Sequence, residues 1–390
     1  MPIIPRVLEF QDELIRIRRD IHAHPELGFE EARTSEIVAS KLRAWGLEVH
    51  RGLAKTGVVG TIRRGNSPRS VGLRADMDAL PIHEINGFAH RSTHDGKMHA
   101  CGHDGHTTML LGAAKYLSET RDFEGAVHFI FQPAEEGQGG GRAMVEEGLF
   151  EKFPCDAVFA MHNKPGIPLG HMGVKPGPIL ASSDSWDIRV KGRGTHAAHP
   201  HLGVDPFVIA SHIVLALQTI VGRNVDPTES AVVSVGFVKG GSTYNVIPDE
   251  VHIGGTVRAF RAEVQDLVER RIREICSGSA AMHGVDVALD YRRRYPPTIN
   301  HAAEAAFAAA VAEEICGPDR VSRNVRPSMG AEDFSFMLNA RPGAMAWVGN
   351  GPGEDGCILH NPRYDFNDSA IPIGVSFFVR LAERFLAKQA

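Results

Sequence analysis

Three short apolar runs constrain the fold of this chain more than any other feature of its sequence. They lie at 71–73, 127–131 and 157–161, and a segment with helical spacing, 107–118, separates the first two. Because their hydrophobicity is continuous rather than alternating, the runs are typical of strands covered on both faces in a mainly parallel sheet. The rest of the α/β pattern agrees, with a strand expected at 344–348 and helices at 13–20, 30–45, 303–315 and 372–386.

A different pattern occupies the stretch between Ser185 and Tyr291. The expected order there is strand, helix, strand, strand, helix, strand, at 186–190, 206–221, 231–238, 250–259, 262–283 and 285–291. This is the β-α-β-β-α-β order of ferredoxin-like α+β folds. A chain of 390 residues also exceeds what one hydrophobic core usually serves. We therefore predict two domains, a larger α/β domain formed by 1–183 plus 295–390 and a smaller domain, 184–294, inserted into it.

Charge and terminal composition narrow the classes of function. The formal net charge of -5 leaves no excess of Lys and Arg to neutralise phosphates, so we expect no nucleic-acid partner. The first residues lack the basic and apolar regions of an export signal, and no segment approaches about 18 apolar residues without charge, so we expect no membrane association. Five scattered cysteines are typical of reduced thiols and predict a cytoplasmic protein.

Polar residues that suit a metal site follow each of the three apolar runs. They are Asp76 and Asp78, then Glu135 and Glu136, then His162. In open α/β sheets such strand ends form the edge at which sites are found. Between them lies the segment 99–106, which supplies Cys101 and His103 and opens the helix at 107–118. Carboxylates alone suit magnesium or calcium, so the added imidazoles and thiol point to zinc, manganese, cobalt or nickel.

Each of these residues also has a plainer interpretation. A lone Cys101 would more often be an inert buried thiol, but His103 follows two residues later across a glycine. The two aspartates after the first run equally fit a helix cap. Adjacent glutamates are usually a solvated pair, whereas the strand before Glu135 and Glu136 and the glycines after them favour a site. One glutamate can then bind a metal while its neighbour accepts a proton from water.

At these positions the sequence resembles the aminoacylase and glutamate-carboxypeptidase clan of metallopeptidases, in the branch of hippurate hydrolase and the plant auxin-conjugate hydrolases. The resemblance spans essentially the whole chain. It is carried by motifs at His24–Glu30, Leu73–Pro81, Met98–His106, Phe131–Gly137, Met161-His162, Gly330–Phe334 and Leu359–Pro362. It implies an α/β fold in which a mainly parallel-sheet, metal-dependent catalytic domain carries an inserted ferredoxin-like α+β domain that serves as lid and dimerisation domain.

The resemblance also implies a cofactor, two divalent metal ions per subunit, with manganese or zinc first and cobalt or nickel as further options. The family's metal ligands match Cys101, His103, Glu136, His162 and His360, and its general base matches Glu135. The chain differs from its relatives at two positions. Asp76 stands where many relatives carry a His ligand, and Cys101 stands where they carry a metal-bridging Asp. These differences bear on which metal is preferred and on whether both sites fill equally.

Three residues of the inserted segment match residues that act on substrate. His196 matches a histidine that reaches the active site of the neighbouring subunit, where it would hydrogen-bond the developing oxyanion. Asn245 and Arg258 match residues that receive the substrate carboxylate, and the planar guanidinium of Arg258 suits that task. The plainer alternatives are a capping His, a turn Asn and a strand Arg that faces solvent. The match of His196 implies a homodimer or homotetramer.

The expected function is that of an amidohydrolase acting on a small-molecule partner, an N-acyl amino acid such as hippurate, to release a carboxylic acid and a free amino acid. The alternative within the enzyme class is a metallo-exopeptidase that acts on dipeptides or aminobenzoyl-glutamate. The alternative from another class is a non-catalytic metal- or ligand-binding protein. Such a protein would have no use for an acid like Glu135 beside the ligands.

Overall fold

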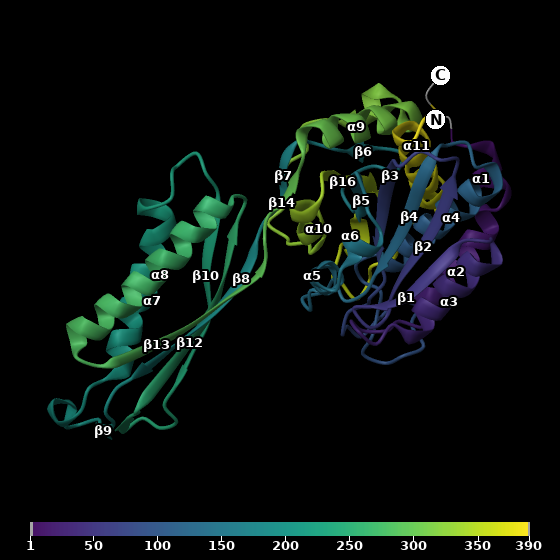
Figure 1. Cartoon of the computed structure of the whole chain (residues 1–390). Helices are drawn as coiled ribbons and strands as arrows, with labels where there is room; N and C mark the ends of the chain where they lie inside the picture. Colours follow the sequence, from purple (N-terminus) through teal and green to yellow (C-terminus); the bar gives the residue numbers. More distant parts are fainter. Residues whose placement is uncertain (1–2, 389–390) are drawn as a thin grey trace. The chain divides into compact units, whose positions relative to one another are not determined.

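The computed structural model describes residues 3–388, and the described chain divides into two compact units (Figure 1). Of the described residues, the first unit comprises 3–179, 299–326 and 333–388. The second unit comprises 180–298 and 327–332. The expected inserted segment, 184–294, lies wholly inside the second unit.

The first unit is built on an eight-stranded sheet in the order β1-β2-β4-β3-β5-β16-β6-β15. Its strands span Glu48–Leu53 (β1), Gly57–Arg64 (β2), Ser70–Asp76 (β3), Gly125–Gln132 (β4), Ala157–Lys164 (β5), Met172–Gly173 (β6), Val321–Ser322 (β15) and Gly343–Gly349 (β16). The central strands β4, β3, β5 and β16 run parallel, which confirms the expected parallel sheet for the centre. The edge strand β1 and its neighbour β2 are antiparallel to each other, because the short turn that joins them cannot make the crossover that parallel neighbours require.

Helices cover both faces of this sheet. In β4, Val127, Phe129 and Phe131 belong to the main hydrophobic core, and the alternate residues Ala126 and Ile130 are buried as well. Since side chains of a strand alternate between its faces, both faces are covered, as the continuous apolar runs predicted. The helices of this unit span Pro5–Glu9 (α1), Gln11–Ala23 (α2), Ala32–Ala44 (α3), His103–Thr120 (α4), Gly140–Glu146 (α5), Leu149–Lys152 (α6), Ala302–Cys316 (α9), Phe334–Ala340 (α10) and Ile371–Phe385 (α11). Of these, α4 and α11 pack together on β3, while α5 packs on β4 and α10 on β5.

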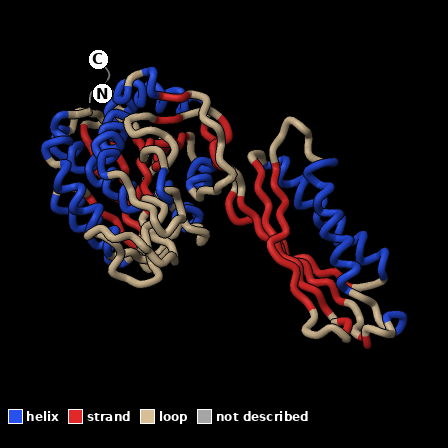
Figure 2. The backbone as a smooth tube through the Cα atoms, turned by 180° about the vertical axis from the view of Figure 1, so that it is seen from behind, coloured by secondary structure: helices blue, strands red, loops and turns tan. Residues whose placement is uncertain are grey.

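The second unit is a four-stranded antiparallel sheet in the order β10-β12-β8-β13, with two helices along one face (Figure 2). In chain order its elements are β8 (Ser183–Lys191), α7 (Pro206–Arg223), β10 (Ala231–Gly240), β12 (Glu250–Ala259), α8 (Ala262–His283) and β13 (Asp286–Tyr295). This is the ferredoxin-like fold expected from the sequence. Trp186, Ile188 and Val190 alternate along β8 and enter a core that is separate from the core of the first unit.

The remaining strands form two short two-stranded sheets. β9 (Thr195–His196) pairs with β11 (Val246–Ile247), and β7 (Gly177–Leu180) pairs with β14 (Thr298–Asn300). Among the described residues, α7 is the one helix long and apolar enough, by length and composition, to cross a membrane. Its inner side chains Ile209, Ile213 and Leu217 belong to the core of the second unit, which is the environment of a core helix.

Candidate active site

The ends of three parallel strands bring the predicted polar residues to one edge of the sheet. β3 ends at Asp76, β5 carries His162 near its end, and the chain reaches Glu135 and Glu136 three and four residues after β4 ends. The carboxyl ends of parallel strands lie at the same edge, which is where open α/β sheets form their sites. α4 begins at the same place, with His103 as its first residue.

Gly102 lies between two candidate ligand residues in the sequence, Cys101 and His103, and its backbone conformation lets both reach the site. It lies directly before α4 with a φ of 94°, in the left-handed region that favours glycine. A Cβ there would come within 2.5 Å of the Asn163 side-chain oxygen and 2.6 Å of the Tyr364 hydroxyl. Both the backbone conformation and the available space therefore require glycine between Cys101 and His103.

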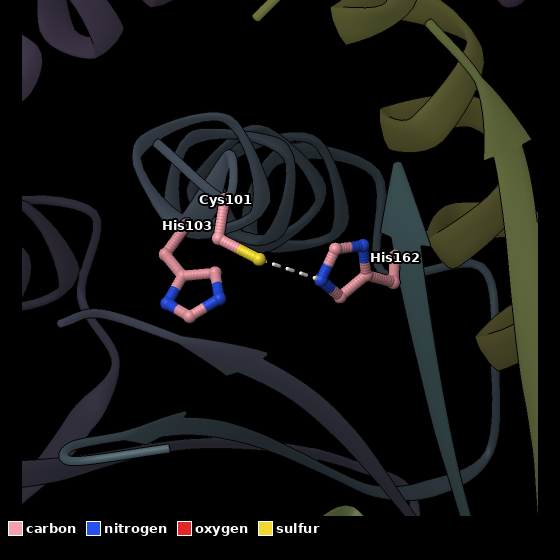
Figure 3. Close-up of side chains that lie close together, drawn as sticks. All are labelled: Cys101, His103 and His162. Carbon is pink, nitrogen blue, oxygen red and sulfur yellow. Dashed lines mark hydrogen bonds between the residues drawn. The ribbon is translucent and has the colours of Figure 1, made fainter. Parts of the chain in front are cut away.

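Cys101, His103 and His162 form a buried triad (Figure 3). The Cys101 Sγ lies 3.3 Å from the Nε2 of His162. The Nδ1 of His162 donates to the backbone oxygen of Asn163 at 2.7 Å, and the Nδ1 of His103 donates to the backbone oxygen of Asp78 at 2.8 Å. With the proton on Nδ1, each imidazole keeps the lone pair of Nε2 available, which is how second-sphere hydrogen bonds orient metal-binding histidines.

Cys101 also belongs to a second triad, with Glu136 and His360. The Nε2 of His360 lies 3.2 Å from Oε1 of Glu136. His360 has a φ of 63°, an unfavourable value for a non-glycine residue, and its N–H donates to the backbone oxygen of Ala100 at 2.7 Å. The N–H of Glu136 donates to Oδ2 of Asp78 at 2.9 Å. Backbone hydrogen bonds thus hold both side chains beside the thiol.

The residues of the two triads fit a pair of divalent cations. Among the described residues, the buried Nε2 of His103 and Oδ1 of Asp78 have no hydrogen-bond partner, and the neighbour of the buried Oε1 of Glu136 is Nε2 of His360 at 3.2 Å. Burial lowers the pKa of His103, but the Asp76 carboxylate and the Cys101 sulfur outweigh it and raise that pKa well above its ordinary value. The site therefore attracts positive charge, and its mixed thiol, imidazole and carboxylate donors suit zinc-like transition metals.

Glu135 lies next to these ligands in a nearly buried position. One of its carboxylate oxygens lies within 4.8 Å of ligand atoms of His103 and Glu136, and its side chain is 6% exposed. The residue before it, Ala134, is buried with a φ of 53°, so the loop is bent sharply at the point where Glu135 leaves it.

A buried carboxyl group from another part of the chain holds this bend. The N–H of Ala134 donates to Oε1 of Glu31 at 2.8 Å, and the hydroxyl of Thr56 donates to Oε2 of Glu31 at 2.6 Å. Burial raises the pKa of Glu31 to about 7. The loop that presents Glu135 is thus fixed by a residue more than a hundred positions earlier in the chain.

The residues that form this site fall inside a match to a known family. A sequence model of peptidase family M20/M25/M40 matches residues 72–384, which is most of the chain. This chain belongs to peptidase family M20/M25/M40.

Several known proteins are similar to this chain along nearly its full length. The hippurate hydrolase of Campylobacter jejuni is 45% identical, over 99% of this chain and 100% of that protein. IAA-amino acid hydrolase ILR1-like 4 of Arabidopsis thaliana is 40% identical, over 97% of this chain and 87% of that protein. The crystal structure of a Bacillus subtilis protein, described as a dinuclear metal binding peptidase from the M20 family, is similar with a TM-score of 0.85 at 34% identity, covering 97% of this chain and 99% of that one. The resemblance to the hippurate and auxin-conjugate hydrolase branch is confirmed.

Asp76, the last residue of β3, is engaged by its neighbours. Its Oδ2 accepts from Arg74 at 2.7 Å, and its Oδ1 lies 2.6 Å from Nδ1 of His106. The Nε2 of His106 accepts from the N–H of Asn163 at 3.0 Å. The sequence motif predicted no role for His106. Its partners, Asp76 and Asn163, lie on two different strands, β3 and β5, far from it in the chain. The structure shows it as a buried link between Asp76 and the residue after His162.

A second buried network lies at the N-terminal turn of α4. Asp104 accepts from Nδ1 of His22 at 2.8 Å, and Arg18 bonds Asp365 and Asp368 at 2.9 and 2.7 Å. Burial lowers the pKa of His22, but hydrogen bonds to Asp104 and Glu84 outweigh it and raise that pKa to about 9. His22 is thus part of the buried network that holds the N-terminal turn of α4. The network ties α2 to the C-terminal loop that follows His360.

The remaining predicted site residues of this M20-family chain lie in the second unit. His196 lies on β9, whose partner β11 begins directly after Asn245, and the N–H of Ala197 donates to the backbone oxygen of Asn245 at 3.0 Å. His196 and Asn245 are therefore neighbours, and both are exposed. Arg258 lies on β12, where its guanidinium donates to the backbone oxygen of Val257 at 2.8 Å. No contact among the described residues joins Arg258 to the other two.

Proposed function

We propose that this protein is a metal-dependent amidohydrolase that cleaves the amide bond of N-acyl amino acids, hippurate among them, using two divalent metal ions. The observation that carries the proposal is the position of Glu135, a nearly buried acid beside a set of donors in which Cys101 belongs to two triads. The names of the M20 relatives, hippurate hydrolase and IAA-amino acid hydrolase, support the same substrate class. Manganese or zinc is the preferred metal in this proposal, with cobalt or nickel next.

The ligands in this proposal are Cys101, His103, Glu136, His162 and His360. When bound, the two ions would supply Lewis-acid chemistry that polarises the amide carbonyl and lowers the pKa of water. Glu135 accepts the proton from the attacking water and returns it to the departing amine, so that the nitrogen leaves as a neutral amine. Its nearly buried position limits competing contacts with solvent, and the Ala134 bend holds its carboxylate near the ligands.

The second unit supplies the contacts to the rest of the substrate in this proposal. His196 donates a hydrogen bond to the developing oxyanion across the subunit boundary of a homodimer or homotetramer. Arg258 and Asn245 receive the α-carboxylate of the amino acid. Arg258 suits that role because its guanidinium is half-buried and forms no ion pair with an acid among residues 3–388. We expect the enzyme in the cytoplasm, in agreement with five free thiols.

The test of the proposed function is hydrolysis of hippurate by metal-stripped protein. We expect no turnover after treatment with a chelator and recovery when manganese, zinc, cobalt or nickel is added singly, because the ligand set alone cannot polarise an amide. Release of glycine and benzoate is followed together with metal content. Full activity in protein shown to hold no metal would contradict the proposal.

A substrate panel separates the proposed amidohydrolase from its alternative. Hippurate, N-acetyl amino acids, dipeptides and aminobenzoyl-glutamate are compared at equal concentration with metal-loaded protein. Preference for the first two classes supports the amidohydrolase, whereas preference for the last two supports the exopeptidase. Metal binding without turnover of any of them would support a non-catalytic binding protein.

Glu31 provides a prediction about the loop that carries the proposed base. Glu31→Ala leaves the buried N–H of Ala134 without an acceptor, which costs about 1–3 kcal/mol. If this free energy favours an inactive conformation of the loop, kcat falls about fivefold to 150-fold. Kinetics of hippurate hydrolysis and metal content measure the effect.

Glu31→Gln is the matched control. A glutamine carbonyl can accept from Ala134 while its amide donates to the Thr56 hydroxyl, so we expect most of kcat to be retained. Equal losses in both variants would show that the loop depends on the charge of Glu31. Unchanged kcat in Glu31→Ala would contradict a positioning role.

A further inference from the structure

Lys164 lies at the wall of the candidate active site. It is the last residue of β5, two positions after His162, so the two side chains leave the strand on the same face. Both lie against Trp347 on the neighbouring strand β16. Trp347 is the register partner of His162, with ring centroids 5.8 Å apart, and the Lys164 Nζ lies 4.9 Å from the Trp347 ring. The Trp347 indole therefore lies near both the Lys164 ammonium and a residue of the Cys101 triad.

Lys164 is partly buried, and its ammonium forms no ion pair with a carboxylate among residues 3–388; the titratable group that acts on it is the Cys101 thiol. Two fully buried cations of this unit are paired with acids: Arg18 contacts three aspartates, and Arg74 contacts Asp76 and Asp333. Lys115, also largely buried, bonds Glu13 at 2.5 Å. Lys164 lacks such a partner, and it lies beside His162 and Trp347, where a substrate would bind.

An unpaired ammonium is an unfavourable choice for packing alone. Removing its hydration costs free energy, and contact with one aromatic face compensates for only part of that cost. An apolar side chain of similar length would cover Trp347 without the cost. A bound anion would compensate for the lost hydration of the ammonium, because a charge-assisted hydrogen bond to a carboxylate is strong where water is partly excluded.

We propose that the Lys164 ammonium binds a carboxylate of the substrate and makes Lys164 a specificity-determining residue. The inference rests on the proposed function, since it assigns the anion to an N-acyl amino acid at the same site. Such a substrate can carry a carboxylate in two places, at the end of a dicarboxylic acyl group and on the amino acid. The two sources share one chemistry and are separated by experiment.

The experiment compares three substrates of metal-loaded protein that share one amino acid. They are its N-glutaryl derivative, its N-pentanoyl derivative, which lacks the terminal carboxylate, and the N-pentanoyl amino acid amide, which lacks both. Lys164→Met removes the charge with an unbranched side chain that can still cover Trp347, and Lys164→Arg retains the charge. Thermal melting checks that both variants fold.

We expect Lys164→Met to lower kcat/KM for the N-glutaryl substrate about tenfold to a hundredfold, the usual worth of one charged hydrogen bond. If the N-pentanoyl substrate is unaffected, the acyl carboxylate is the source. If both acids lose equally and the amide does not, the source is the α-carboxylate. Lys164→Arg should keep most of the activity in either case. Equal losses on all three substrates, or no loss on any, would overturn the proposal.

Binding of product acids tests Lys164 without turnover. Titration calorimetry with metal-loaded protein gives the dissociation constants of glutarate, pentanoate and the free amino acid. We expect Lys164→Met to weaken glutarate or the amino acid at least tenfold and to leave pentanoate unchanged. Equal affinities in wild type and Lys164→Met for all three would overturn the proposal. Failure of every substrate to be hydrolysed would instead count against the proposed function, and the binding result would still decide the role of Lys164.

Discussion

Glu135→Gln is expected to lower kcat about 10²- to 10⁴-fold, the usual contribution of a positioned general base. The glutamine amide has nearly the size of the carboxylate, so the packing around it is preserved, but it cannot accept the proton of the attacking water. We expect the metal content to stay at the wild-type value, since the proposed ligands surround Glu135 and do not include it. Hippurate turnover and metal analysis of the same preparation measure both quantities.

Glu136→Gln is the matched control for this prediction. It removes one negative charge at the next residue, whose Oε1 lies 3.2 Å from Nε2 of His360. Because Glu136 is proposed as a ligand, this variant should lose metal and regain part of its activity at higher metal concentration. A Glu135→Gln protein that turned over normally would remove Glu135 from the mechanism. Loss of metal in that variant would make Glu135 a ligand.

Arg18→Met is expected to cause the largest loss of stability. The guanidinium of Arg18 is 1% exposed and bonds Asp365 and Asp368, with Asp104 at 3.5 Å. Removing one partner of a buried ionic network leaves the other charges uncompensated, which typically costs about 3–5 kcal/mol. The urea midpoint of the first unit, followed by the fluorescence of Trp45 and Trp347, should therefore fall strongly.

Arg19→Met, at the next residue, separates this effect from the loss of any arginine. Arg19 pairs with the same Asp368, but its side chain is 50% exposed. Exposed ion pairs contribute at most about 1 kcal/mol, so the urea midpoint should hardly change. Equal shifts in the two variants would show that burial does not set the contribution of Arg18.

Much of the fold follows from local patterns in the sequence. The apolar runs predicted β3, β4 and β5, and the expected helix at 262–283 has the bounds of α8. The hairpin of β1 and β2 was missed, because most residues of β1 are exposed and carry no apolar period. The two-residue strands β6 and β15 were missed because they are too short to show a period.

The candidate site could be predicted in part. Cys101, His103, Glu136 and His162 stand beside strand ends or a helix start, so the sequence alone marked them. His360 lies in a loop without a period, and only the family resemblance pointed to it. Glu31 carried no signal of its role, since the N–H that it binds belongs to Ala134, far away in the chain.

By itself, the sequence determined where helices and strands form and which residue types reach the edge of the sheet, because those properties depend on spacings of a few residues. Only the tertiary structure decided which polar atoms have partners. The pKa of His22 is raised because Asp104 and Glu84 hydrogen-bond its ring, and Lys164 has Trp347 beside it but no carboxylate at ion-pair distance among residues 3–388. Such partners are brought together by long-range packing, and their separation along the chain does not predict that they will be in contact.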